Sequence, residues 1–107
     1  MVVKLRTKRP DPILRQIVEA LKEYDKAHPA AQIETYRQNA VSVRIRVIDP
    51  DFAGLGRAER EEELWTLFNR LPEDVVAEIS LLLLLTPEEA KSSFANMEFD
   101  NPIPSRL

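Results

Sequence analysis

Five consecutive leucines at positions 81–85 constrain the fold of this chain more than any other feature of its sequence. The run follows Ile79-Ser80 and ends at Thr86-Pro87, a length that is typical of a buried strand and far too short to span a bilayer. Because successive side chains of a strand point to opposite faces, this strand is apolar on both. One layer of helices can cover only one face of a sheet, so we expect a second surface to cover the other.

Local patterns predict a helix near the N-terminus. Asp11 is a good helix cap, and Pro12 fits the first helical position. An apolar stripe with helical spacing follows as far as Tyr24. The helix should end at His28, because proline follows at position 29.

A hairpin and two further helices precede the leucine strand. Residues 32–37 and 41–48 are predicted as two strands joined by a turn at 38–40, because the second segment alternates apolar and polar side chains. A longer helix at 57–70 and a short one at 73–77 then lead to the leucines. Helical crossovers are right-handed and join parallel strands, so the leucine strand should lie parallel to the second strand of the hairpin.

The last helix is expected to begin at Thr86, where Thr86-Pro87-Glu88-Glu89 forms a capping box. The predicted order is therefore α-β-β-α-α-β-α. This is an α+β fold with a three-stranded mixed sheet and helices on one face. A chain of 107 residues has room for one core. We expect a single domain at 11–98, preceded by an extended basic arm at 1–10 and followed by a flexible, proline-containing tail at 99–107.

The open face of this sheet is the first candidate site. If Ile79 and the odd-numbered leucines point to the helices, the even-numbered leucines project from the opposite face. Tyrosine and arginine beside aliphatic residues are typical of a protein interface, so we expect a homodimer or another protein partner there. In the alternative, the C-terminal helix or tail folds back over this face through Phe94, Met97 or Phe99. The residues expected on the face are Tyr36, Arg44, Arg46, Ile48, Leu82 and Leu84.

A nucleic-acid site is the rival hypothesis. A basic footprint could bind phosphates, with Tyr36 available for base stacking. The net charge of −3 argues against broad affinity for nucleic acids. Such binding would weaken steeply with salt, whereas an apolar protein interface would not. The residues of this footprint are Lys4, Arg6, Lys8, Arg9, Arg37, Arg44 and Arg46.

Composition removes several other functions. The chain has no cysteine, which excludes disulfides, thiolate catalysis and cysteine-ligated metals or clusters. Together with the absence of an apolar N-terminal signal, this leads us to expect a cytoplasmic protein with no membrane role.

The titratable residues suggest no enzyme. His28, the only histidine, is expected to be structural, at a helix end where it complements the helix dipole. Asp49 and Asp51 fit a turn, although with Glu59, Glu62 and Glu63 nearby they could hold a hard cation such as magnesium. We predict no catalytic residue, no metal and no cofactor.

Two strings of this sequence resemble BolA-like proteins, the stress-induced morphogen family. VIDPDFAG at residues 47–54, followed by an arginine-containing helix, resembles a strand and loop of that family. LTPEE at 85–89 resembles the end of its last strand and the start of the next helix. The resemblance implies a three-stranded sheet with helices on one side, a topology shared with type II KH domains, and it implies no enzyme activity.

The resemblance also implies partners. BolA-like proteins are associated with monothiol glutaredoxins and [2Fe-2S] clusters through a histidine of the second helix, and some with DNA. Glu61 stands at the matching position here, and a carboxylate is a poor substitute at a cluster iron, so cluster sharing is not expected. The junction at residues 70–73 lacks the GxxG loop with which KH domains bind nucleic acid.

Overall fold

Helix α1 (Pro12–Ala27) forms where the apolar stripe predicts it. The Asp11 side chain accepts a hydrogen bond from the Leu14 amide at 2.9 Å, which satisfies one of the free N–H groups of the first turn. Leu14, Ile17 and Leu21 are fully buried. The apolar side of α1 therefore forms one wall of the core.

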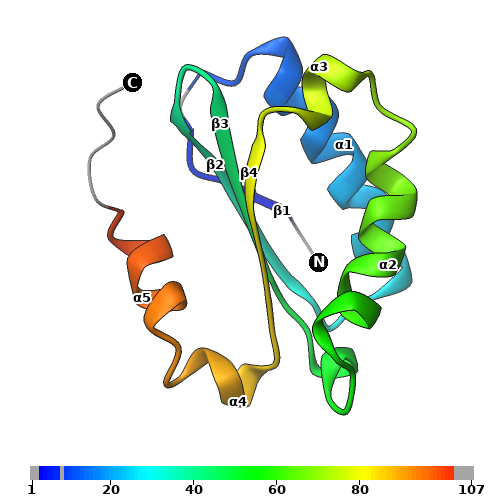
Figure 1. Ribbon diagram of the computed structural model, residues 1–107, viewed down its shortest axis with the longest axis vertical. Coiled ribbons are helices and arrows are strands. Elements are labelled where there is room, and N and C mark those ends of the chain that lie inside the picture. Colours follow the sequence, from blue (N-terminus) through cyan, green and yellow to red (C-terminus); the bar gives the residue numbers. More distant parts are fainter. Residues whose placement is uncertain (1–2, 8, 103–107) are drawn as a thin grey trace.

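The computed structural model describes residues 3–7 and 9–102, and a four-stranded mixed sheet runs through this part of the chain (Figure 1). Its strands follow in the order β1 (Val3–Leu5), β2 (Gln32–Asn39), β3 (Ser42–Ile48) and β4 (Ile79–Leu85). The pair β2 and β3 is antiparallel, whereas β1 with β2 and β3 with β4 are parallel. The α+β class is confirmed and the parallel β3–β4 pair is as predicted.

The expected number of three strands is wrong because part of the basic arm is a strand. Val3 pairs with Ile33 and Leu5 pairs with Thr35, so residues 3–5 belong to the sheet and not to an arm outside it. Position 8 of the same segment lies outside the described residues. A strand of three residues carries too little alternation to be seen in a sequence.

One face of the sheet is covered by α1 together with α2 (Arg57–Phe68) and α3 (Glu73–Val76), as Figure 1 shows. Val43, Ile45 and Val47 of β3 point to these helices and are fully buried with Leu64 and Phe68 of α2. A 3-10 turn, η1 (Pro50–Phe52), connects β3 toward α2. The main core therefore lies where the alternation of β3 places it.

The opposite face carries a second helical layer. The last predicted helix is divided into α4 (Pro87–Ala90) and α5 (Phe94–Asp100), and α5 stands on the side of the sheet away from α1 and α2 (Figure 1). Phe99 of α5 is fully buried and packs edge-on against Tyr36, with ring centroids 4.9 Å apart. The prediction that helices cover only one face is therefore wrong, and so is the prediction that the tail starts at residue 99. Residues 103–107 of that expected tail lie outside the described part of the chain.

The register of β4 corrects the predicted direction of its leucines. Val43 pairs with Ile79 but Arg44 pairs with Leu81, so Ser80 is an extra residue at a bulge. After it, Leu82 and Leu84 lie beside Ile45 and Val47 and pack against the main core. Leu81, Leu83 and Leu85 take the α5 face instead. The prediction that Leu82 and Leu84 project from the open face is therefore wrong, because one extra residue exchanges the two faces of a strand.

No helix among the residues described here combines the length and the apolar character that crossing a bilayer requires.

Candidate functional site

β4 lies at the edge of the sheet, and within the described residues no strand pairs with its outer side. The Leu85 carbonyl accepts a hydrogen bond from the Asp49 amide at 2.9 Å and so faces β3. Since backbone groups alternate along a strand, the N–H and C=O groups of Leu82 and Leu84 face outward. Arg60 confirms this direction, because its Nη1 donates to the Leu84 carbonyl at 3.1 Å.

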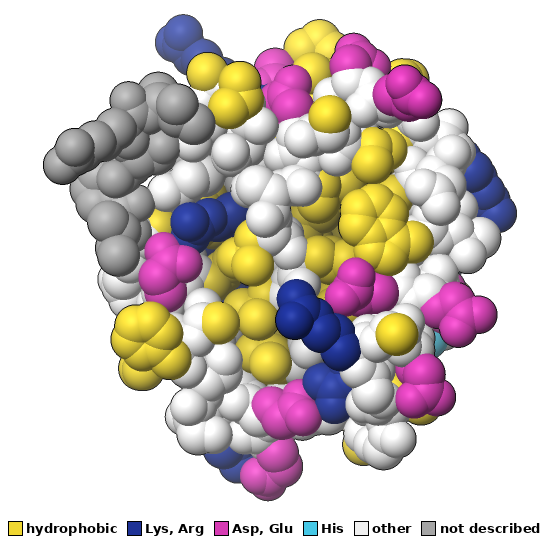
Figure 2. All heavy atoms as spheres, in the orientation of Figure 1, with side chains coloured by type: hydrophobic (Ala, Val, Ile, Leu, Met, Phe, Trp, Pro, Cys, Tyr) yellow, Lys and Arg dark blue, Asp and Glu magenta, His cyan; other side chains and the backbone are white. Residues whose placement is uncertain are grey.

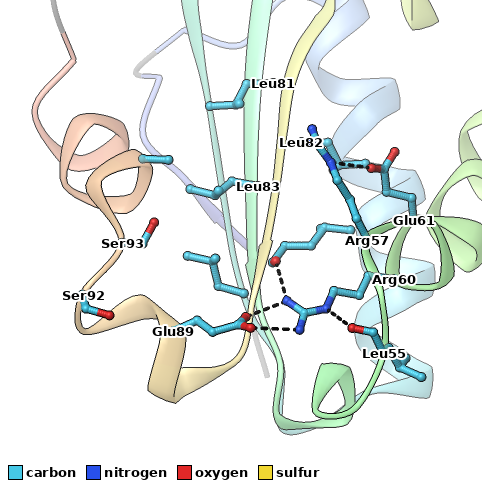
Figure 3. A pocket seen from close by; sticks show the side chains of 13 residues that line it. Leu55, Arg57, Arg60, Glu61, Leu81, Leu82, Leu83, Glu89, Ser92 and Ser93 are labelled. Carbon is cyan, nitrogen blue, oxygen red and sulfur yellow. Dashed lines mark hydrogen bonds and ion pairs between the residues drawn. The ribbon is translucent and has the colours of Figure 1, made fainter.

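A groove with a volume of about 630 Å³ runs along this edge. Residues 81–85 form its floor, and Arg57, Arg60 and Glu61 of α2 form one wall (Figure 3). The other wall comes from the end of α4 and the start of α5, through Glu89, Ser92, Ser93 and Ala95. In Figure 3, Leu81 and Leu83 point toward α5, while Leu82 points toward α2. Figure 2 shows apolar side chains in the hollow and charged side chains at its rim.

All five leucines of β4 are partly exposed. The equivalent apolar residues of β3 are fully buried, because β3 has neighbours on both sides. Two helical layers are thus present and still leave residues 81–85 partly exposed. A contiguous apolar strip of this kind marks a site for another molecule more often than a solvated surface.

Arg60 is the best-anchored charged residue at the rim. Its guanidinium donates to both Glu89 carboxylate oxygens, at 2.6 and 3.0 Å, and to the Leu55 carbonyl at 3.0 Å. The hydrogen bond from Arg60, together with the one from the Thr86 amide, lowers the pKa of Glu89 to about 2. Glu89 therefore stays ionised over the whole physiological pH range.

The other polar residues of the rim are paired as well. Arg57 and Glu61 form an ion pair at 3.4 Å, and the Trp65 indole N–H donates to Glu61 at 2.9 Å. The groove therefore combines an apolar floor with a rim that carries both signs of charge.

Of the six residues predicted for the open face, only Leu82 and Leu84 line this groove. Tyr36 is 7% exposed, and its hydroxyl donates to the Phe99 carbonyl at 3.1 Å. Arg44 pairs with Glu98 at 2.8 Å and Arg46 with Asp100 at 2.7 Å. The face predicted to be open is thus covered by α5. This agrees with the alternative hypothesis, in which the C-terminal helix folds back over the face.

Four arginines of the predicted nucleic-acid footprint, all except Arg9, are engaged within the protein. Arg37 pairs with Asp11 at 2.6 Å and with Glu78 at 2.7 Å. Arg6 donates to the Phe99 carbonyl at 2.8 Å, and its guanidinium lies 4.1 Å from the centre of the Tyr36 ring. Lys4 and Arg9 are exposed. Arg6, Arg37, Arg44 and Arg46 each form an ion pair with a carboxylate of the chain, which argues against phosphate binding by these four residues.

Sequence reasoning missed Leu81 and Leu83 as exposed residues of the groove, and it missed Arg60 and Glu89 altogether. The strand order did indicate this exposure, because the leucine strand is the last strand after the helical crossover and no later strand follows to pair with its outer edge. Family models, curated proteins and solved structures give no significant match to this chain. The chemistry of the groove therefore has to be judged from its own geometry.

Proposed function

We propose that this chain is a non-catalytic protein-binding module, and that the outer edge of β4 receives a strand from a second copy of the chain. The observation that carries this proposal is the leucine edge itself, whose five consecutive leucines are partly exposed on the strand that ends the sheet. The sequence led us to expect the binding site on the sheet face, and we now propose that it lies on the sheet edge.

Strand addition satisfies both parts of the edge. Main-chain hydrogen bonds to an added strand provide affinity, and its alternate side chains fill the pockets on either face. Leu82 offers an N–H and a C=O on the outer side, and Leu84 offers its N–H. The Leu84 carbonyl already accepts from Arg60, and its second lone pair can accept the Leu82 N–H of an added strand.

A second copy fits this edge because the strand is complementary to itself. In an antiparallel pair centred on Leu83, Leu81 faces Leu85 of the other copy and Leu82 faces its Leu84, so that every cross-strand pair is leucine with leucine. A two-fold interface requires this self-complementarity. The rim satisfies it too, since each copy carries Arg57 and Glu61 on the same helix.

The test is sedimentation of the wild type and of two variants that make the same charge change. Leu83→Glu places a carboxylate in the groove beside Arg46, its neighbour in β3, which favours a folded monomer. Val41→Glu is the control, because Val41 is 54% exposed at the β2–β3 turn, away from the groove. We expect the wild type and Val41→Glu to dimerise equally at low and high salt, and Leu83→Glu to be a folded monomer.

Two results would contradict the proposal. One is a wild type that remains monomeric at every soluble concentration, which would leave the edge to a different protein. The other is a Leu83→Glu variant that dimerises as the wild type does. Association with nucleic acid that weakens steeply with salt would support the rival hypothesis instead.

A further inference from the structure

The His28 ring lies among three carboxylates, away from the groove. His28 follows the end of α1, Asp49 and Asp51 flank the start of η1, and Glu63 belongs to α2. The Nδ1 atom lies 3.3 Å from Asp49 Oδ2 and 3.0 Å from Asp51 Oδ2, while Nε2 lies 2.8 Å from Glu63 Oε1. Segments distant in the sequence thus meet at one imidazole.

Two carboxylates converge on a ring nitrogen that can donate only one hydrogen. Asp49 is fully buried, and Asp51 approaches the same Nδ1 from a more exposed position. One N–H cannot satisfy two such acceptors well, whereas a cation between the three atoms could contact all of them. The three ligand atoms lie within 4.8 Å of one another.

The ring is held in a fixed orientation. Tyr24 stacks on His28, with ring centroids 4.1 Å apart and an angle of 12° between the planes. The Tyr24 hydroxyl donates to Asp49 Oδ2 at 2.8 Å. Burial, together with this hydrogen bond, raises the pKa of Tyr24, so its hydroxyl stays protonated and fixes the Asp49 carboxylate.

The charge of this cluster is not balanced by basic side chains. Within the described part of the chain, no lysine or arginine forms an ion pair with Asp49, Asp51 or Glu63. A protonated His28 would balance one of the three carboxylates, of which Asp49 is fully buried while Asp51 and Glu63 are 65% and 50% exposed. Asp49 accepts hydrogen bonds from the Tyr24 hydroxyl and the Asp51 amide, and a divalent cation beside Nδ1 would balance the remaining excess of negative charge.

We propose that His28 Nδ1, Asp49 and Asp51 bind a divalent first-row transition metal ion of the Zn²⁺ type, with Glu63 orienting the imidazole. Zinc bound by nitrogen and oxygen at about 2.0–2.2 Å places its ligand atoms roughly 3.4 Å apart, close to the two separations found at Nδ1. A carboxylate on the far nitrogen of a metal-bound histidine is a recurrent arrangement. Imidazole favours such an ion over magnesium, which prefers oxygen ligands and near-octahedral geometry.

A proton is the competing occupant of the ring. Burial by itself would lower the pKa of His28, but hydrogen bonds with Glu63 and Asp51 raise it above its ordinary value of 6.5. Zinc must displace that proton, so binding is best measured at mildly alkaline pH.

The experiment is calorimetric titration of the full chain with Zn²⁺ and, separately, with Mg²⁺. Wild type should bind one zinc ion per chain and bind magnesium far more weakly. Asp51→Asn and His28→Gln should each weaken zinc binding by at least about tenfold, and Glu63→Gln by about tenfold. Glu62→Gln is the matched control, because it removes the neighbouring carboxylate on the same helix and should leave the zinc affinity unchanged.

A second readout is the visible spectrum of the Co²⁺-loaded protein, which should change in Asp51→Asn but not in Glu62→Gln. Asp51 is largely exposed, so its variant remains informative even if His28→Gln fails to fold. The proposal is overturned if the wild type shows no saturable zinc binding up to the highest zinc concentration that stays in solution at that pH. It is also overturned if Asp51→Asn binds zinc as tightly as the wild type.

Discussion

At the scale of single residues, Asp11 combines two roles that a sequence shows separately. Its Oδ1 caps α1 through the Leu14 amide, and its Oδ2 accepts a hydrogen bond from Arg37 Nε at 2.6 Å. The hydrogen bond from Arg37, followed by the one from Leu14, lowers the pKa of Asp11 below its ordinary value of 3.8. The start of α1 is thereby tied to β2.

We expect Asp11→Asn to reduce the free energy of unfolding by up to about 1 kcal/mol at neutral pH, because asparagine keeps the cap and loses only a partly exposed ion pair. A lowered folded-state pKa contributes stability above 3.8 that is lost as the pH falls through the folded value. The difference in unfolding free energy between the wild type and Asp11→Asn should therefore disappear in acid. Denaturant unfolding over this pH range measures it, and a gap independent of pH would refute the role of the charge.

Arg60 provides a second prediction at this scale. In Arg60→Met, the pKa of Glu89 should rise from about 2 toward its ordinary value of 4.5. It should not rise fully, because the Thr86 amide still donates to Glu89 at 3.0 Å. Carboxyl NMR titration of both proteins provides the measurement. An unchanged Glu89 pKa in the variant would mean that the rim ion pair does not form in solution.

At the scale of elements, α5 is held to the sheet by one aromatic ring and several arginines. Arg6 and Arg46 both lie over the Phe99 ring, with guanidinium carbons 4.9 and 4.7 Å from its centre. Arg44 and Arg46 add the ion pairs to Glu98 and Asp100. The second face of the sheet is thus closed by a helix of only seven residues.

Phe99→Ala should cost about 3 kcal/mol of unfolding free energy if α5 unfolds together with the rest of the domain. If α5 detaches by itself, the cost appears as faster amide hydrogen exchange confined to residues 94–100. Phe94→Ala is the control, since Phe94 is 78% exposed on the same helix and should change neither quantity. Equal effects of the two substitutions would contradict the described anchoring of α5.

The success of sequence reasoning also differs by element. The apolar stripe of α1 and the alternation of β3 follow from patterns that local physics enforces, and both are confirmed. The bulge at Ser80 could not be predicted, because a run of identical leucines carries no alternation to fix its register. The position of α5 depends on tertiary contacts of Phe99, and sequence spacing alone left Phe94, Met97 and Phe99 equivalent.

At the scale of the whole molecule, the two edges of the sheet differ. β1 ends one side with three residues, whereas β4 presents seven residues on the other side, of which five are leucine. Proteins protect long apolar edges with charges, prolines, bulges or covering segments. Here the bulge lies at the start of β4, and Arg60 occupies a single carbonyl near its end. The stretch between them is left for a partner strand.

The most direct test of strand addition is amide hydrogen exchange of Leu82 as a function of protein concentration. Its N–H faces away from β3, so it should exchange rapidly in dilute protein and become protected as copies pair. In Leu83→Glu it should stay rapid at every concentration. A Leu82 amide that exchanges rapidly in concentrated wild type would contradict the account, as would one equally protected in the dilute monomer.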